Sequence, residues 1–231
     1  MKVRRCSSMA LMTMLMCIVE ACWAGQLPEA VSPPLSPLLL PQTFQLDPAE
    51  TRSRFEVKFM GFITVRGRFE RTTGTLLRDP ALRNSSITAV IDATSLQANT
   101  ANARATNRIL RGPEFFQVEK FPTIEFRSSQ FVYEGEQLQR IDGTLTLLGV
   151  TRPVALAMTA AQCMPAEALR LARCEASAAV TVKRSDYGML GWNESVADEV
   201  KIIVELVAVE TGRELPVQKP EMDAAANKPV Q

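Results

Sequence analysis

Histidine, the residue that most often acts as a general base near neutral pH, is absent from all 231 residues of the chain. Its absence excludes a Ser-His or Cys-His nucleophile and any metal site built on imidazole. Carboxylates alone can bind Ca²⁺, but the sequence has no Asp-rich loop with metal-ligand spacing, and it has no glycine-rich phosphate loop. We therefore predict a protein without catalytic residues, metal or cofactor.

Arg184 and Asp186, beside Tyr187-Gly188, are a candidate polar site. Two interpretations are open for them. The two charges could face a binding site, or they could form a salt bridge that fixes the turn before the glycine. We favour the structural salt bridge.

The elements that would position such side chains are mostly β-strands. Over residues 53–59, phenylalanine and valine alternate with charged residues, which is the period-two pattern of a half-buried strand. The pattern breaks at Met60-Gly61 and resumes over residues 63–69, which predicts a hairpin with one apolar and one charged face. Gly67 takes an apolar-face position in its second strand, which suggests a bulge or strong coiling of the strand.

Further strands with the same pattern are predicted at residues 74–78, 85–94, 123–133, 138–148, 154–158, 176–182 and 200–206. Together with the hairpin they make eight or more strands, which suits an antiparallel barrel or sandwich. The stretch from Thr100 to Arg111 is rich in Ala, Asn and Arg without alternation, and it predicts one helix that ends at Gly112-Pro113. We expect this helix to cap one mouth of a barrel.

The first 24 residues have the pattern of a secretory signal peptide. Basic residues among the first five precede an apolar run over residues 9–19, which is too short to span a membrane. Ala24 suits cleavage, so we expect Gly25 to begin a mature, periplasmic protein. A lipoprotein anchored at Cys22 is the alternative, although Glu20 stands where a small or aliphatic residue normally precedes the lipid-bearing cysteine.

Cys163 and Cys174 are the two cysteines outside the predicted signal. In an exported protein, two thiols that flank a short loop most often form a disulfide, which we predict here, with free thiols or a redox pair as alternatives. A disulfide would make the strands on either side antiparallel. Without residues 1–24, 23 Lys and Arg face 24 Asp and Glu, a net charge of about −1 that does not favour nucleic acid.

Two further segments flank the predicted domain, which we place at residues 43–211. Residues 25–42 contain five prolines and are expected to form an extended linker. Residues 212–231 are rich in proline, alanine and charge without periodicity, and are expected to form a disordered tail. The predicted order is signal peptide, linker, one β domain and tail.

Five ordered motifs run through this domain. They are Asp47-Pro48-Ala49; Val65-Arg66-Gly67-Arg68-Phe69; Phe115-Phe116 before Phe121-Pro122-Thr123-Ile124-Glu125-Phe126; Gly143-Thr144-Leu145-Thr146 with Gly149-Val150-Thr151-Arg152-Pro153-Val154; and Arg184-Ser185-Asp186-Tyr187-Gly188 followed by Val200-Lys201-Ile202. In these motifs the chain resembles the YceI-like family of exported, lipocalin-like barrels that are associated with polyisoprenoids and other long-chain amphiphiles. The resemblance implies an all-β, antiparallel lipocalin-like barrel of eight or more strands, with one α-helix capping a mouth.

The chain departs from the family pattern at polar positions. Glu50 and Phe59 stand where histidines are common, and Asn107 and Ile109 replace the usual Asp and His of the helix. Phe59 makes the entrance more apolar, which would favour a hydrocarbon over a polar head group, or else it fills the tunnel.

Strand alternation places many apolar side chains on one face, and the resemblance implies that they line or close a continuous tunnel. These residues are Phe55, Val57, Phe59, Val65, Phe69, Phe115, Phe116, Ile124, Phe126, Leu145 and Leu147. We therefore expect a non-catalytic carrier of a long apolar ligand such as a polyisoprenoid, a quinone tail or a fatty amide. A protein-interaction module with a closed core and a lipid-modifying enzyme are the alternatives. A homodimer and transient membrane contact are open as further partnerships.

Overall fold

The computed structural model describes residues 41–79, 84–167 and 170–211. The predicted signal peptide, the predicted tail and all but the end of the predicted linker lie outside these residues. Within the described ranges, no helix has the length and hydropathy needed to span a membrane.

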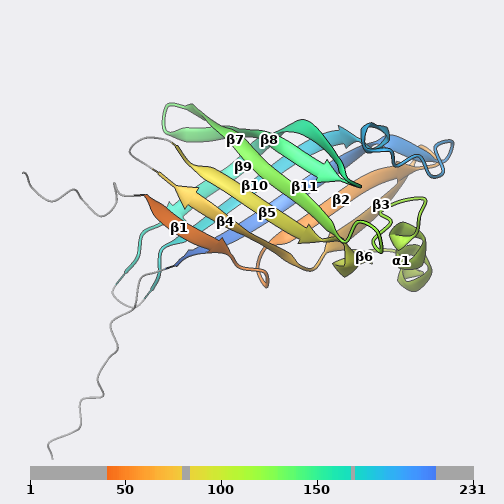
Figure 1. Ribbon diagram of the computed structural model, residues 1–231, viewed down its shortest axis with the longest axis horizontal. Helices are drawn as coiled ribbons and strands as arrows, with labels where there is room; N and C mark the ends of the chain where they lie inside the picture. The colour runs from red at the N-terminus through yellow and green to blue at the C-terminus, as the bar shows by residue number, and fades with distance from the viewer. Residues whose placement is uncertain (1–40, 80–83, 168–169, 212–231) are drawn as a thin grey trace, which may run out of the picture. The chain divides into compact units, whose positions relative to one another are not determined.

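The described chain is mostly β-structure with one α-helix (Figure 1). The strands are β1 (Gln42–Leu46), β2 (Arg52–Phe59), β3 (Ile63–Phe69), β4 (Thr72–Arg78), β5 (Ser86–Asp92), β6 (Leu96–Ala98), β7 (Thr123–Glu134), β8 (Gln137–Leu147), β9 (Val150–Met164), β10 (Arg173–Lys183) and β11 (Val196–Glu210). The helix is α1 (Ala103–Arg111), and short 3₁₀ turns are η2 (Ala93–Ser95) and η3 (Arg184–Tyr187). Strands β1 and β6 were not predicted, because five and three residues are too few to show a clear alternation.

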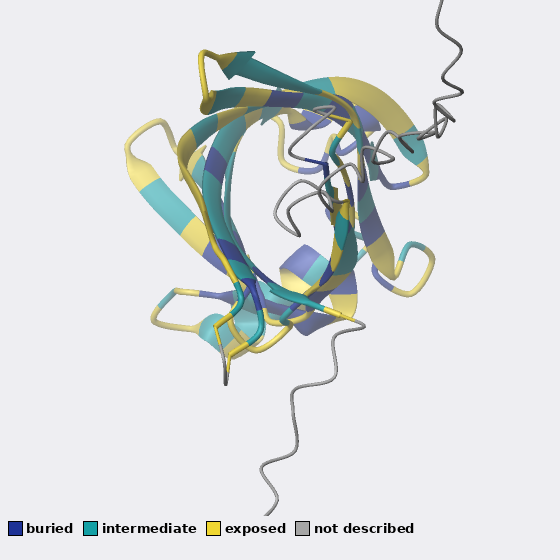
Figure 2. Ribbon diagram, turned by 90° about the vertical axis from the view of Figure 1, so that its left-hand side faces the viewer, coloured by how far each residue is buried: buried dark blue, intermediate teal, exposed yellow. Residues whose placement is uncertain are grey.

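Three pairs of consecutive strands each act as one long bent strand: β1 with β2, β3 with β4, and β5 with β6. The first bent strand lies beside the second, because β1 pairs with β4 and β2 pairs with β3. The second lies beside the third, because β4 pairs with β5 and β3 pairs with β6. Counted this way, the sheet is an antiparallel meander of eight strands. Strand β11 then pairs with both β2 and β1, which closes the ring seen in Figure 2. The fold is thus the predicted closed barrel, in which no long sheet edge is left free.

Register is continuous through the β2–β3 hairpin, from the pair Ser53 and Phe69 to the pair Phe59 and Ile63. The bulge suggested by Gly67 is therefore absent. The glycine is needed for space, because a Cβ at this position would overlap the ring of Phe55 on the neighbouring strand. Gly67 thus leaves the space that the end of the Phe55 ring occupies beside the β3 backbone.

A two-residue turn joins β8 to β9 and sets their register. Leu148 and Gly149 both have positive φ, 52° and 75°, which is the turn type that matches the twist of a hairpin. Glycine is favoured at the second position for a further reason, since a Cβ there would lie 3.0 Å from the ring of Phe121. Leu148 keeps its side chain buried despite its left-handed backbone.

Helix α1 lies at one end of the barrel, as predicted (Figure 1). It begins at Ala103, three residues later than expected, because the side chain of Asn102 caps it by accepting a 3.3 Å hydrogen bond from the N–H of Ala105. Asn107 ties the helix to β6: its Oδ1 accepts from the Ala98 N–H at 2.7 Å, and its Nδ2 donates to the Gln97 side chain at 2.8 Å.

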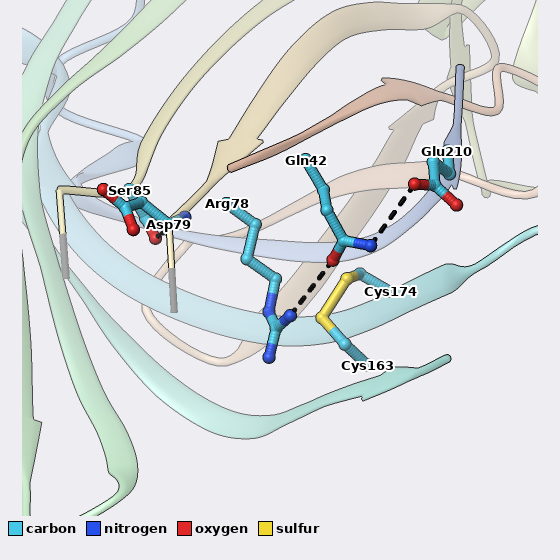
Figure 3. The surroundings of a disulfide bond; sticks show 7 residues. All are labelled: Gln42, Arg78, Asp79, Ser85, Cys163, Cys174 and Glu210. Atoms are coloured by element: carbon cyan, nitrogen blue, oxygen red, sulfur yellow. Dashed lines mark hydrogen bonds between the residues drawn. A yellow bond between two sulfur atoms is a disulfide. The ribbon is translucent and has the colours of Figure 1, made fainter. Parts of the chain in front are cut away.

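The disulfide between Cys163 and Cys174 is present and links β9 to β10. The two residues are direct antiparallel partners with their Cα atoms 4.0 Å apart, so the predicted pairing and strand direction are both confirmed. Close to it, Arg78 donates to Gln42, which donates to Glu210, both at 3.3 Å (Figure 3). This polar chain ties β4, β1 and β11 together beside the disulfide.

Candidate ligand-binding site

The barrel encloses two adjoining cavities. Cavity 1 lies beside α1 and has a volume of about 260 Å³; cavity 2 extends to the disulfide and has a volume of about 330 Å³. Four residues line both and mark the waist between them: Ser53, Ile91, Leu145 and Ile202. The two cavities therefore adjoin within the barrel interior, which the sequence had predicted to hold one continuous tunnel.

Ten of the eleven predicted lining residues surround cavity 1. They are Phe55, Val57, Phe59, Val65, Phe69, Phe115, Phe116, Ile124, Leu145 and Leu147. The eleventh, Phe126, lines cavity 2 instead. Phe126 lies two residues after Ile124 on the same face of β7. Because a strand advances by about 3.3 Å per residue, Phe126 lies on the other side of the waist from Ile124.

An aromatic cluster forms one wall of cavity 1. The rings of Phe55, Phe69 and Phe116 lie with their centroids 5.5 to 5.9 Å apart. Phe115 packs edge-on against Trp192 at 5.8 Å. Tilted and edge-on arrangements at these distances are favourable for aromatic rings, so the wall is well packed.

The connection between β10 and β11 closes part of cavity 1 and is held by one buried cation. The guanidinium group of Arg184 donates to the carbonyl oxygens of Met189, Gly191, Val196 and Ala197 at 2.7 to 3.1 Å. Burial lowers the pKa of Arg184, since it takes the guanidinium out of water. The side chain thus has a structural role, as predicted, in shaping the loop.

The partner predicted for Arg184 was wrong. Asp186 makes no ion pair with it among the described residues; its carbonyl oxygen instead accepts from Arg152 at 3.2 Å. The acid that fixes the turn is Asp198, which accepts from the N–H and hydroxyl of Ser185 at 2.9 and 2.8 Å. These hydrogen bonds hold the pKa of Asp198 below its ordinary value, and the bond from the Ser185 N–H has the largest effect. Asp186 had been predicted as the partner of Arg184 because it is closer to Arg184 in the sequence than Asp198 is.

The waist contains a buried polar pair. Ser53 and Thr72 are each 1% exposed, and their hydroxyl groups share a hydrogen bond of 3.0 Å. Each hydroxyl satisfies the other, which is what allows polar groups to lie within an apolar interior.

Cavity 2 is lined by more polar residues than cavity 1. Its inner part is formed by Leu76, Ile87, Phe126, Ile141 and Leu156. Toward the disulfide, the lining includes Arg78, Glu136, Gln137, Gln162 and Glu175. The two ends of the barrel therefore differ in chemistry, and the end beside α1 is the apolar one.

The four positions that depart from the family pattern serve two purposes. Glu50 lies outside both cavities and accepts from Arg173 at 2.5 and 3.0 Å, which lowers the pKa of the carboxyl. Asn107 anchors α1, as described above. Phe59 and Ile109 line cavity 1, so both substitutions make its entrance apolar.

Several lining residues were missed by sequence reasoning. Val182, Val200 and Ile202 lie on predicted strands and could have been added to the lining by the same alternation. Met189 and Trp192 lie in an irregular connection without periodicity, so no pattern in the sequence pointed to them.

Comparison with known proteins agrees with this architecture. A family model described as the YceI-like domain matches residues 44–208. A UPF0312 protein of Vibrio cholerae is 30% identical over 109 residues, 47% of this chain and 56% of its own length. One from Enterobacter sp. is 36% identical over 105 residues, 44% of this chain and 52% of its own length. The matches thus span about half the length of these curated relatives.

Solved structures show the same fold. The crystal structure of Burkholderia cenocepacia BcnA aligns with a TM-score of 0.57 at 22% identity, covering 70% of this chain and 98% of BcnA. A polyisoprenoid-binding domain from Saccharophagus degradans aligns with a TM-score of 0.54 at 15% identity, covering 73% and 99%. Because the family model covers most of the barrel and these barrels superpose on it, the chain belongs to the YceI-like family.

Proposed function

We propose that this protein is an exported carrier that binds one long apolar chain, such as a polyisoprenoid, a quinone tail or a fatty amide, in cavity 1. The observation that carries the proposal is the lining of this cavity, which is made almost wholly of aliphatic and aromatic side chains around about 260 Å³. A polyisoprenoid-binding domain among the structural neighbours supports the same class of ligand. Two internal cavities also speak against a closed, filled core that serves only as an interaction module.

The apolar chain of the ligand enters cavity 1 from the end beside α1. Ile109 and Trp192 line cavity 1 and are also 39% and 48% exposed, so the opening lies between α1 and the β10–β11 connection. The apolar residue Phe59, close to this end, makes the entrance suited to hydrocarbon. A polar head group would remain in water outside it.

The ligand leaves unchanged. The ionisable side chains among those lining cavity 1 are Arg54 and Arg184. Arg54 is ion-paired with Glu205, and Arg184 is bound to four carbonyl oxygens. Neither arginine can act as a general acid or base near neutral pH, which supports binding without catalysis.

Export to the periplasm is part of the proposal. It rests on the signal-peptide pattern of residues 1–24 and is supported by the Cys163–Cys174 disulfide, since such bonds persist in oxidising compartments. A lipid anchor at Cys22 is the alternative, and the intact mass of the mature protein distinguishes the two.

A chain-length series tests the binding site. Each methylene removed from water contributes about 0.8 kcal/mol, or roughly fourfold in affinity, so affinity should rise with ligand length and level off when the cavity is full. Val200→Phe fills part of cavity 1 and should move this plateau to shorter chains. Val204→Phe is the matched control, because Val204 lies on the same face of β11 but lines cavity 2.

Mass spectrometry of an organic extract of the purified protein would identify the natural ligand. Affinity that is indifferent to chain length, or a plateau that Val200→Phe leaves in place, would contradict binding in cavity 1. A ligand recovered in chemically altered form would contradict the carrier role.

A further inference from the structure

Six exposed apolar side chains lie on the elements at the end of the barrel where cavity 1 opens, and we call them the apolar rim; two of them, Ile109 and Trp192, also line the cavity. They are Met60 and Phe62 from the β2–β3 turn, Ile63 at the start of β3, Ile109 from α1, and Leu190 and Trp192 from the β10–β11 connection. Their exposed fractions run from 39% for Ile109 to 77% for Phe62. The other two large apolar side chains with comparable exposure in the described chain, Leu77 and Met164, belong to β4 and β9. The exposed apolar surface is therefore concentrated at one end of the barrel.

The three elements of the rim are held together. The N–H of Met60 donates to the carbonyl of Ser195 at 2.7 Å, which joins the β2–β3 turn to the β10–β11 connection. The ring of Trp192 packs on Phe115, which follows α1 in the chain. Figure 1 shows α1, this turn and this connection at the same, right-hand end of the barrel. The rim is thus one surface built by three connected elements.

Helix α1 adds positive charge beside the rim. Arg104 and Arg108 lie one turn apart and are exposed, and within the described residues neither makes an ion pair or a hydrogen bond. The helix itself contains no acidic residue. Glu114 and Glu194 carry negative charge at this end, but both lie outside α1. The uncompensated charge on the helix is therefore positive.

We propose that the apolar rim and these two arginines dock the barrel on the surface of a bilayer that contains anionic lipids. Exposed apolar side chains gathered around an opening mark an interaction site, and side chains as exposed as Phe62 project outward and do not form a groove for a peptide. Projecting apolar residues beside unpaired arginines fit an anionic lipid interface, where the former enter the headgroup region and the latter bind phosphate.

Docking in this orientation places the opening of cavity 1 against the bilayer. An apolar chain could then pass between bilayer and cavity without crossing water. This transfer step rests on the proposed function, whereas docking itself does not depend on what cavity 1 binds.

Sedimentation with vesicles tests the proposal, using phosphatidylcholine alone and phosphatidylcholine mixed with phosphatidylglycerol. The wild type should bind the anionic vesicles more tightly. Phe62→Asp should weaken that binding by about tenfold or more. Arg104→Gln with Arg108→Gln should weaken it by about fivefold per arginine, roughly 30-fold in all, without changing binding to the neutral vesicles. Met164→Asp is the control, because Met164 is 44% exposed at the disulfide end and should bind as the wild type does.

Trp192 provides a second readout. It is one of two tryptophans in the chain, and the other, Trp23, lies in the predicted signal peptide, so in protein that begins at Gly25 the fluorescence of Trp192 should shift to the blue on anionic vesicles. Unchanged vesicle binding by Phe62→Asp, equal loss in Met164→Asp, or no binding by the wild type would overturn the proposal. Self-association that Phe62→Asp abolishes would also overturn it, since the rim would then face a second copy. A wild type that takes up ligand in solution but does not bind vesicles refutes docking alone, and a wild type that binds vesicles but takes up no ligand refutes the proposed function alone.

Discussion

Replacing Gly67 with alanine should destabilise the barrel, because the new methyl group would enter space that the Phe55 ring occupies. A Cβ at Gly67 would lie 2.5 Å from Cε1 and 3.2 Å from Cε2 of Phe55, and closer still to Cζ. The ring has little freedom to retreat, since it packs against Phe69 and Phe116 with centroids 5.9 and 5.6 Å away. Overpacking of this kind costs about 1 to 3 kcal/mol of unfolding free energy.

A double-mutant cycle isolates this contact. Phe55→Leu deletes Cε1, Cε2 and Cζ, the three atoms nearest to the added methyl group. In the Phe55→Leu background, Gly67→Ala should be neutral or should stabilise by about 0.4 to 1 kcal/mol, because alanine restricts the unfolded chain more than glycine does. The two substitutions should therefore be coupled by roughly 1.4 to 4 kcal/mol.

Urea denaturation of the wild type, the two single variants and the double variant measures this coupling. Equal m-values across the four proteins would show that the midpoints report stability and not a change in the unfolded state. If Gly67→Ala costs the same free energy in both backgrounds, the ring does not lie over the glycine, and the aromatic wall of cavity 1 is arranged differently.

Three further predictions concern stability. Ser53→Ala or Thr72→Val alone should each cost about 1 to 3 kcal/mol in urea denaturation, because the remaining hydroxyl loses its partner, and the double variant should cost less than the sum; strict additivity would argue against the shared hydrogen bond. Serine at both Cys163 and Cys174 should cost about 2 to 3 kcal/mol, and a variant as stable as the wild type would contradict a bond that constrains the unfolded chain. The pKa of Asp198 is lowered on folding, so its stabilising contribution is present above the ordinary value of 3.8 and is lost as the pH falls below it. The Asp198→Asn variant should accordingly lose less stability in acid than the wild type, as measured by thermal denaturation. Parallel profiles of melting temperature against pH for the two proteins would count against this.

Local alternation was enough to predict most of the fold. Phe55, Val57 and Phe59 alternate with charged residues, and β2 places them inward, because successive side chains of any strand point to opposite faces. The pairing of Cys163 with Cys174 was also predictable, since a short loop between two thiols restricts them to neighbouring strands.

Which inward-facing residues line each of the two cavities was not predictable from alternation. Ile124 and Phe126 have the same facing in the sequence, yet they line different cavities, because the boundary depends on which side chains from other strands meet at the same height in the barrel. The bulge suggested at Gly67 was wrong for the same reason. The requirement for Gly67 comes from Phe55, twelve residues away in the chain and opposite it in the sheet.

The sequence by itself thus determined all of the strands except β1 and β6, the facing of their side chains, the helix and the disulfide, because each depends on residues close together in the chain or on a single pairing. The tertiary structure alone decided how β1 and β2 share β11 to close the barrel, and which acid meets Ser185. It also decided that Met60, Ile109 and Trp192 gather around one opening. These features arise where strands and loops distant in sequence converge, and that convergence is set by closure of the whole sheet, which no local pattern records.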